Sequence, residues 1–596
     1  MLQEILEVFG EIVQQDSRIV TDSYSLKDGT YRLIEMNNQD GWKINETIDI
    51  FYDKKSKQTN GSQNSNYAYI QELDYYSKLL EMNKPIDPKK VIHSCHYLSL
   101  AVKKDSILSG KLNNDIIKKY YAILKNPMSK YEKKANSRKL YEKVEKEIGQ
   151  VDIELIDSIE DYVLHTDIFE GINLDKKDYV KVFFVFGDQS KTLDYYKREN
   201  KRYLLPNLYN SNDYNVEDGK DILGLPNNNM NLNSKKPFLL NKTRKVKTPY
   251  LVNQEQALLQ AQFFDYLWGQ VSKGCYDFYI NTFGGKNELL PISNDSQLIG
   301  RNIQGYYIHC QKGKNEAEII DSQVVSSFSN RLNKSFCLEN YMEIPEKFIE
   351  KSGFQYDEYI DSVIGIFNII DRVFFANKLN RTLYSDADNI QIIDGHLKRC
   401  LLTYRDKLKL FKNTGDILVL KSIVDKMSWD IITNTMSQNS QFMVQHQLNL
   451  RWSLLDYFND ERKIGEKIMN VKNQLRVHIN LPKGYDWDFD GDEEFNFAVG
   501  QLIQYFLFLN KSSKKTHAYV NQYLNCKDVK KLKQKLIQMY KKYSYAIDYY
   551  PESRSEKLIE HIMQYDTHSI LPEYIVSGFN AQLLIIEKNK EENKDE

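Results

Sequence analysis

The sequence predicts an α+β fold in which a mixed α/β body is followed by helical regions and a C-terminal helical bundle. Strand-like runs alternate with helical patterns up to about residue 350, and almost only helical periodicity follows. The chain has 596 residues, 41% of them hydrophobic, which is enough for more than one core. We therefore predict an α/β body at 1–355, a helical region at 356–468 and a bundle at 469–596.

The α/β body opens with a helix, because Leu2, Ile5, Leu6 and Phe9 recur at helical spacing. The strongest signal of a buried strand is YVKVFFVF at 179–186, a nearly continuous apolar run. The other elements predicted for the body are a strand pair at 31–52, strands at 91–102, 276–282, 302–310 and 317–320, and helices at 113–124, 130–148 and 254–270.

The C-terminal half shows helical periodicity almost throughout. The helix predicted at 494–509 places Phe495, Leu502 and Phe506 on one face, and the helix at 528–545 has an apolar seam opposite its lysines. Such seams suit antiparallel packing in a bundle. The other helices predicted here are 358–379, 404–411, 417–436 and 443–457.

A long polar segment, 203–250, is inserted in the body and is expected to read nucleic acid. Its length and its few periodic apolar residues are unlike those of an ordinary connection. Proteins that read nucleic acid contact base edges with polar side chains such as amides and contact phosphates with cations. The segment offers both kinds of side chain in succession. The alternative is a solvated Asn/Lys-rich loop. The asparagines are Asn227, Asn228, Asn229, Asn231 and Asn233, and the cations are Lys235, Lys236, Lys242, Arg244, Lys245 and Lys247.

A second basic stretch lies in the predicted bundle. Between Lys511 and Lys542, ten lysines oppose a single acidic residue, Asp528. Solubilising charge normally mixes signs, so this one-sidedness favours a face that follows nucleic-acid phosphates over a merely solvated one. The lysines expected to line the face are Lys511, Lys514, Lys515, Lys530, Lys531, Lys535, Lys541 and Lys542.

The overall composition limits the location and the partners. The net charge is −1, so any nucleic-acid surface must be local. The six cysteines are scattered without a CxxC pair, which argues against a disulfide framework and a zinc ribbon. The first residues do not read as a signal peptide, and no apolar run approaches the roughly 18 residues of a membrane span. We therefore expect a cytoplasmic protein with no membrane partner.

The best case for catalysis is a metal-dependent nuclease built from Asp386, Asp388, Asp394 and His396. Two-metal hydrolysis needs carboxylates that hold ions about 4 Å apart. The alternative, which we favour, is that these aspartates form turns on either side of a short strand, NIQII at 389–393. A stand-alone nuclease is therefore the rival to a binding function.

Three further motifs are incomplete. Residues 486–491 imitate the start of an EF-hand loop, but Phe497 stands where the bidentate acid belongs. FGDQSKT at 186–192 lacks the glycines of a P-loop. HSCH at 93–96 alternates along a predicted strand, so its side chains point to opposite faces. We predict no catalytic residue, no metal site and no cofactor.

Several blocks of the sequence together resemble one known family. The blocks are KKVIHSCHYLSLAVKKDSILSGKL, YLLPNLYNSNDYNV, GLPNNNMNLNSKKPFLLNKTRKVKTPYLV and DGDEEFNFAVGQLIQYFLF. In this order, from about Val91 to the C-terminus, they resemble the large subunit of type I-B CRISPR surveillance (Cascade) complexes. The resemblance implies a non-catalytic subunit that reads the protospacer-adjacent motif (PAM) on duplex DNA. It also implies that the subunit holds guide RNA and unwound DNA and recruits a separate helicase–nuclease.

The resemblance gives roles to the polar and basic stretches. It implies that Asn227–Asn233 reads the PAM, that the cations of 235–247 anchor flanking phosphates, and that the 511–542 face guides the displaced strand. Lys103, Lys104 and Lys130 are further candidates for holding the guide RNA or nearby backbone. The implied partners are the CRISPR RNA, target double-stranded DNA, the backbone and handle-capping subunits, small subunits and the helicase–nuclease.

The resemblance also bears on the C-terminal bundle. In this family the C-terminal part resembles the small subunit of the complex, which is also made separately from an internal start. Met469 follows Gly465 and Glu466, whose codons can spell GGAG, a ribosome-binding sequence. We therefore predict that a second product begins at Met469.

Overall fold

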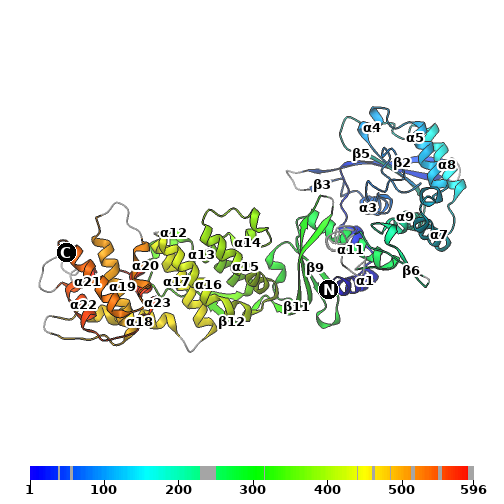
Figure 1. Ribbon diagram of the computed structural model, residues 1–596. Coiled ribbons are helices and arrows are strands. Elements are labelled where there is room, and N and C mark those ends of the chain that lie inside the picture. The colour runs from blue at the N-terminus through cyan, green and yellow to red at the C-terminus, as the bar shows by residue number, and fades with distance from the viewer. Residues whose placement is uncertain are drawn as a thin grey trace. The chain divides into compact units, whose positions relative to one another are not determined.

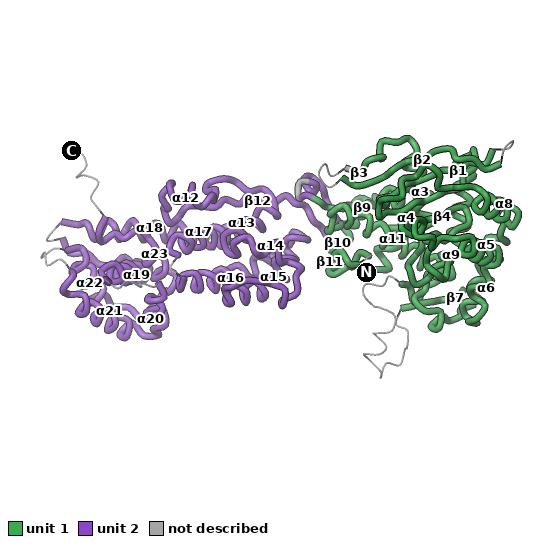
Figure 2. Tube along the Cα trace, turned by 90° about the horizontal axis from the view of Figure 1, so that it is seen from above, with its two compact units in different colours: residues 1–293, 305–322 green, residues 294–304, 323–596 purple. Residues whose placement is uncertain are grey.

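The structure is a computed structural model with two compact units. Unit 1 contains residues 1–293 and 305–322, and unit 2 contains residues 294–304 and 323–596 (Figure 2). Strands and helices are both present, and all regular elements described beyond Ser362 are helical, so the predicted α+β class with a helical C-terminal region is confirmed (Figure 1). The described residues are 1–37, 41–53, 58–219, 221–227, 250–314, 316–438, 440–459, 463–482, 485–511, 517–547 and 553–587.

Unit 1 is built from two larger sheets, the helices that pack on them and a short two-stranded hairpin described below. The first sheet has the order β3-β2-β1-β5-β4 and the second the order β11-β10-β8-β9. The strands of the first sheet are β1 (Gly29–Asn37), β2 (Gly41–Asp53), β3 (Gln58–Asn60), β4 (Ser99–Lys103) and β5 (Tyr179–Phe186). Those of the second are β8 (Asp277–Asn281), β9 (Glu288–Ile292), β10 (Asn302–Lys312) and β11 (Ala317–Ser329), which continues into unit 2. The helices are α1 (Leu2–Gln15), α2 (Ile19–Ser23), α3 (Tyr67–Ser77), α4 (Lys104–Leu108), α5 (Asn114–Lys125), α6 (Met128–Tyr131), α7 (Ala135–Ile148), α8 (Ile153–His165), α9 (Gln189–Leu204) and α11 (Gln254–Ser272).

Strand β5 lies inside the first sheet, parallel to β1 and antiparallel to β4. Successive side chains of a strand point to opposite faces. Phe184 contacts Tyr162 of α8, with ring centroids 6.3 Å apart, whereas Phe183 contacts Tyr196 of α9 at 6.4 Å. Helices therefore cover both faces of β5, which is why an apolar run without alternation predicted it correctly.

Unit 2 is mainly helical. One of its hydrophobic clusters joins buried residues between Met342 and Ile585, contributed mainly by the helices from α17 to α23. The buried residues of α13 and α15 are not part of this cluster. The predicted boundaries at 355/356 and 468/469 stay predictions. The elements are β12 (Arg331–Cys337), α12 (Glu346–Ser352), β13 (Tyr359–Ser362), α13 (Val363–Phe375), α14 (Leu379–Thr382), α15 (Gly395–Thr414), α16 (Ile417–Ser437), α17 (Gln441–Phe458), α18 (Ile464–Ile479), α19 (Asp492–Leu509), α20 (Asn521–Leu524), α21 (Val529–Tyr543), α22 (Arg554–Gln564) and α23 (Pro572–Asn580).

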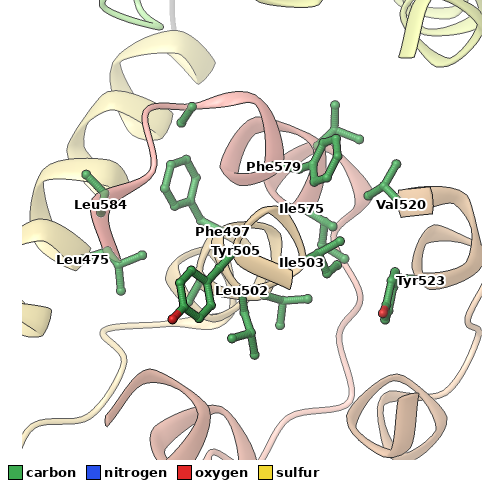
Figure 3. Close-up of a cluster of buried hydrophobic side chains, with 14 of the residues drawn as sticks. Leu475, Phe497, Leu502, Ile503, Tyr505, Val520, Tyr523, Ile575, Phe579 and Leu584 are labelled. Atoms are coloured by element: carbon green, nitrogen blue, oxygen red, sulfur yellow. The ribbon is translucent and has the colours of Figure 1, made fainter. Parts of the chain in front are cut away.

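Helix α19 lies against α23 at backbone contact distance. Figure 3 shows side chains of both helices in one hydrophobic cluster, Phe497 and Leu502 from α19 and Ile575 and Phe579 from α23. A Cβ on Gly500 would clash with the carbonyl oxygen of Ile575 and lie 2.7 Å from the backbone nitrogen of Phe579. A Cβ on Gly578 would lie 2.9 Å from the carbonyl carbon of Phe497. Only glycine has no Cβ, so these two glycines allow the close approach.

Buried amides of α19 bind the backbone at both ends of α23. Asn496 Oδ1 accepts a hydrogen bond from Leu571 N at 3.0 Å, just before α23 begins. Gln501 Nε2 donates to Gly578 O at 2.6 Å, and its Oε1 accepts from Leu584 N at 2.8 Å. Helix ends carry backbone groups without partners inside the helix, so these amides satisfy groups that burial would otherwise penalise.

Three predicted helices have different bounds in the structure. The helix predicted at 130–148 is two helices, α6 and α7. The helix predicted at 358–379 begins only at Val363, because the residues before it pair with β12 as strand β13. Helix α15 begins at Gly395 rather than at 404, because the Asp394 side chain caps it, and no described strand occupies 389–393.

We expect Gly500→Ala to destabilise unit 2 by about 3 kcal/mol. The added methyl group would meet backbone atoms of α23, and these can move only if the helix shifts. Gly395→Ala is the matched control, since a Cβ at this helical position has no neighbour within 4 Å. It should change stability by less than about 0.5 kcal/mol. Urea unfolding followed by circular dichroism measures both, and equal midpoints for the two variants would show that α19 and α23 do not pack at this distance.

Candidate nucleic-acid interface

Helix α21 carries most of the described part of the basic face predicted in the bundle. Asp528 caps the helix, because its side chain accepts a hydrogen bond from Lys530 N at 2.8 Å. Apolar residues at helical spacing turn one side of α21 to the core, which leaves the opposite side to solvent. The buried residues are Val529, Leu532, Leu536 and Tyr543.

The outward side of α21 is a row of lysines that have no acidic partner among the described residues. Lys530, Lys531, Lys541 and Lys542 are exposed, and no described carboxylate forms an ion pair with any of them. We call these four residues the α21 face. At about 1.5 Å per helical residue the row is about 18 Å long, which suffices for contacts with several successive phosphates.

The surroundings of the α21 face include an aromatic ring that the sequence analysis did not single out. Tyr545 is 69% exposed, and the ammonium nitrogen of Lys511 lies 5.8 Å from its ring centroid. Exposed cations beside an exposed ring suit single-stranded nucleic acid, whose phosphates and bases they contact respectively. Lys535 is less available, because its Nζ donates to Gln522 O at 2.6 Å. Lys514 and Lys515 lie outside the described residues.

Helix α7 shows that a basic sequence does not by itself make such a face. Three lysines on or next to it form ion pairs with acidic residues on a short hairpin, β6 (Val216–Asp218) and β7 (Asp221–Leu223), and on the turn before it. Arg138 pairs with Glu142 within the helix at 3.6 Å. The pairs with the hairpin region are Lys134–Asp213 at 3.6 Å, Lys139–Glu217 at 2.7 Å and Lys143–Asp221 at 2.9 Å.

Of the three lysines proposed for the guide RNA, two are held inside unit 1. Lys104 is 2% exposed and lies 2.8 Å from Asp178. Lys130 Nζ donates to the carbonyl oxygens of Lys84, at 3.2 Å, and Pro85, and burial lowers the pKa of Lys130 to about 8. In this structure neither ammonium group is available to a phosphate. Lys103 is exposed at the end of β4 and stays a candidate.

The central polar segment leaves and returns through a defined stem. Gly224 and Val252 exchange backbone hydrogen bonds of 2.9 and 3.0 Å. The Tyr209 hydroxyl donates toward Val252 O at 3.0 Å, and a Cβ on Gly224 would clash with the Tyr209 ring. Asn227 is half-buried, and its backbone nitrogen donates to Leu208 O at 3.3 Å. The other predicted residues of this segment lie outside the described residues: Asn228, Asn229, Asn231, Asn233, Lys235, Lys236, Lys242, Arg244, Lys245 and Lys247.

The carboxylates of the rival nuclease hypothesis do not gather into a metal-binding group among the described residues. Asp394 accepts hydrogen bonds from the backbone nitrogens of His396, at 2.9 Å, and Leu397, at 3.1 Å. The side chains of Asn434 and Gln438 donate to its other oxygen. Burial by itself would raise the pKa of Asp394, but these hydrogen bonds lower it. Asp394 therefore acts as a helix cap whose oxygens are already engaged.

The EF-hand-like stretch at 486–491 takes part in capping helix α19, which is not the role of a calcium-binding loop. Glu494, in the first turn of α19, accepts a hydrogen bond from Asp490 N at 2.8 Å and lies 2.7 Å from His478 Nδ1. Its carboxylate is thus directed back to the start of the helix. Burial raises the pKa of Glu494.

One other group of potential ligands occurs among the described residues, where Cys337, Glu339 and Asp357 place ligand atoms within 4.8 Å of one another. Burial and the two neighbouring carboxylates raise the pKa of Cys337 to about 12. Structural zinc sites have four protein ligands, whereas three groups gather here and Asp357 is exposed. The group gives no reason to assign a metal.

Comparison with known proteins gives no match. No protein-family model matches this chain, and neither a curated protein nor a solved structure does. The family resemblance of the sequence blocks therefore stays a prediction. Within the described ranges, no helix is both long enough and apolar enough to cross a membrane.

We expect the triple variant K530Q/K531Q/K541Q to bind single-stranded oligonucleotides more weakly than the wild type. The slope of log affinity against log salt should become shallower by about 2, since three phosphate contacts are lost. The control K125Q/K409Q/K463Q removes the same charge from lysines that already have acidic partners and lie outside α7 and α21, and it should leave affinity nearly unchanged. Fluorescence anisotropy at several salt concentrations measures both. An equal loss in the two variants would mean that net charge, rather than the α21 face, determines binding.

Proposed function

We propose that this chain is the non-catalytic large subunit of a type I-B CRISPR RNA-guided surveillance complex. In this role it recognises the PAM on double-stranded DNA, promotes unwinding and R-loop formation, binds guide RNA and the displaced strand, and recruits the helicase–nuclease. The observation that carries the proposal is the α21 face, an exposed row of lysines without described acidic partners in a chain of net charge −1. The ordered sequence blocks that resemble the family support it independently.

The proposed mechanism follows from what a guide RNA cannot do. Pairing reads a target only after the duplex has opened, so a protein element must test closed DNA first. We assign this test to the asparagines of 227–233, since amide side chains pair with adenine in the major groove or probe the acceptors of the minor groove. The cations of 235–247 then contact flanking phosphates, which adds affinity and salt dependence without base specificity.

The stem of the central segment supports this assignment. A recognition loop must be presented from a fixed base, because each freely moving residue loses conformational entropy when it binds. The β-bridge between Gly224 and Val252 provides such a base shortly before Asn227, and the hydrogen bond from the Tyr209 hydroxyl to Val252 O stabilises it. The α21 face, in unit 2, is proposed to follow the displaced strand once the duplex has opened.

The partners proposed for the chain are those of the family. They are the CRISPR RNA, the target duplex, the backbone and handle-capping subunits, the small subunits and the helicase–nuclease. The chain itself is proposed to supply no catalytic residue, so cutting depends on the recruited enzyme. Cleavage of labelled DNA by the purified chain with Mg²⁺ or Mn²⁺ would instead support the stand-alone nuclease.

We expect N227A/N228A/N229A to abolish the preference for PAM-bearing duplex while the complex still assembles. Neutralising Lys242, Arg244, Lys245 and Lys247 should instead weaken binding to all duplexes alike and flatten the salt dependence. Gel-shift assays with matched and PAM-mutant duplexes separate the two outcomes. If the asparagine variant still prefers the correct PAM, another element of the complex reads it.

We also propose that a second product, a small subunit, begins at Met469. Met469 lies in α18, so the shorter chain lacks the first five residues of this helix, including the buried Ile468, and keeps Val471, Leu475 and Ile479. Replacing the Met469 codon by a non-start codon should remove a short chain that co-purifies with the complex. Its persistence in mass spectra of the complex would contradict an internal start at this position.

A further inference from the structure

The acidic hairpin β6–β7 and the turn before it lie along helix α7. The three ion pairs follow one another along both partners: the lysines are five and four residues apart, and their acidic partners are four and four apart. Two neutral hydrogen bonds accompany them. Asn136 Nδ2 donates to Asn212 O at 3.0 Å, and Asn212 Nδ2 donates to Ser137 Oγ at 3.0 Å. The hairpin region thus places a row of carboxylates against a row of ammonium groups.

A row of carboxylates on a row of lysines has the same charge pattern as a nucleic-acid backbone on a basic helix. Lys139 and Lys143 are four residues apart and therefore share one side of α7, as does the exposed Lys146, which forms no ion pair with any described residue. The acidic residues belong to the first part of the polar segment 203–250, before its asparagines. The lysines that they cover are distant in the chain, but their ion pairs bring them beside the segment proposed to read duplex DNA.

The ion pairs are of the kind that a polyanion displaces. Their side chains are well exposed: 67% and 63% for Lys134 and Asp213, 52% and 63% for Lys139 and Glu217, and 33% and 54% for Lys143 and Asp221. Exposed pairs contribute little to stability and are screened by salt. A phosphodiester backbone carries charge at higher density than the hairpin does, and it gains further from the release of its counterions.

We infer that the side of α7 formed by Lys139, Lys143 and Lys146 is a second nucleic-acid-binding surface, which Glu217 and Asp221 cover in the free protein. The ligand is a phosphodiester backbone, and binding requires the hairpin carboxylates to give way to phosphates. This inference deepens the proposed function, because it names a further place where the same chain holds nucleic acid. It concerns unit 1 alone and is independent of the α21 face in unit 2.

The test uses the full chain with E217Q/D221N, which removes two covering charges and leaves Lys139 and Lys143 in place. The matched control is E142Q/E147Q, which removes two negative charges from α7 itself without uncovering these lysines. Both variants are also made together with K530Q/K531Q/K541Q, so that binding through the α21 face does not hide the effect. The probes are a labelled single-stranded RNA, a single-stranded DNA of the same sequence and a duplex DNA, each measured by fluorescence anisotropy.

We expect E217Q/D221N to bind at least one probe about threefold to tenfold more tightly than the control at ~0.1 M salt, with a salt slope steeper by about 1.4 for a single strand. Adding K139Q/K143Q should abolish the gain. The probe with the largest gain identifies whether RNA, single-stranded DNA or duplex is the ligand. Affinities equal to those of E142Q/E147Q for all three probes would overturn the inference. The proposed function is tested separately, by the PAM preference of the assembled complex, so either can fail alone.

Discussion

The crossing of α19 and α23 determines how the rest of the C-terminal helices pack. Gly500 and Gly578 bring the two backbones together, and the buried amides of Asn496 and Gln501 then satisfy the ends of α23. Helix α21 packs its apolar side on the same core that contains α19. Since a helix has fixed angular spacing, burying Leu532 and Leu536 leaves Lys530, Lys531, Lys541 and Lys542 on the solvent side. The position of the candidate interface thus follows from packing in the core.

Much of the fold was predictable where the periodicity was strong. The buried strand β5, the helices α16 and α17, and the amphipathic helix α21 follow directly from apolar spacing. The start of α15 does not follow from apolar spacing because a polar residue determines it: Asp394 caps the helix, whereas the sequence pattern predicts a turn beside a strand. Strand β13 was missed because only its pairing with β12 distinguishes Tyr359–Ser362 from the start of a helix.

The candidate site was predictable in part, and the limit lies in side-chain partners. The sequence shows the lysines of α4, α7 and α21 equally well. It does not show that Asp178 holds Lys104 or that the hairpin carboxylates pair with Lys139 and Lys143. These partners are about 74 to 78 residues distant in the chain, so no local pattern reveals them. The acidic stretch EDGKD at 217–221 was a signal in the sequence, although nothing local connects it with α7.

A chain with 81 basic and 82 acidic residues has no long-range field that draws nucleic acid to its whole surface. The proposed binding would therefore depend on where no described carboxylate pairs with a lysine, as on the α21 face, or where a pairing carboxylate is displaced, as proposed for α7. Contacts with phosphates hold a strand in position and do not select its sequence. For the proposed subunit of an RNA-guided complex, phosphate contacts of limited strength would be an advantage, because a guide can reject a mismatched target only if the protein contacts alone do not retain it. The strength with which this chain would hold or release a nucleic-acid strand therefore depends on how its charges are paired locally, and not on how many charges it has.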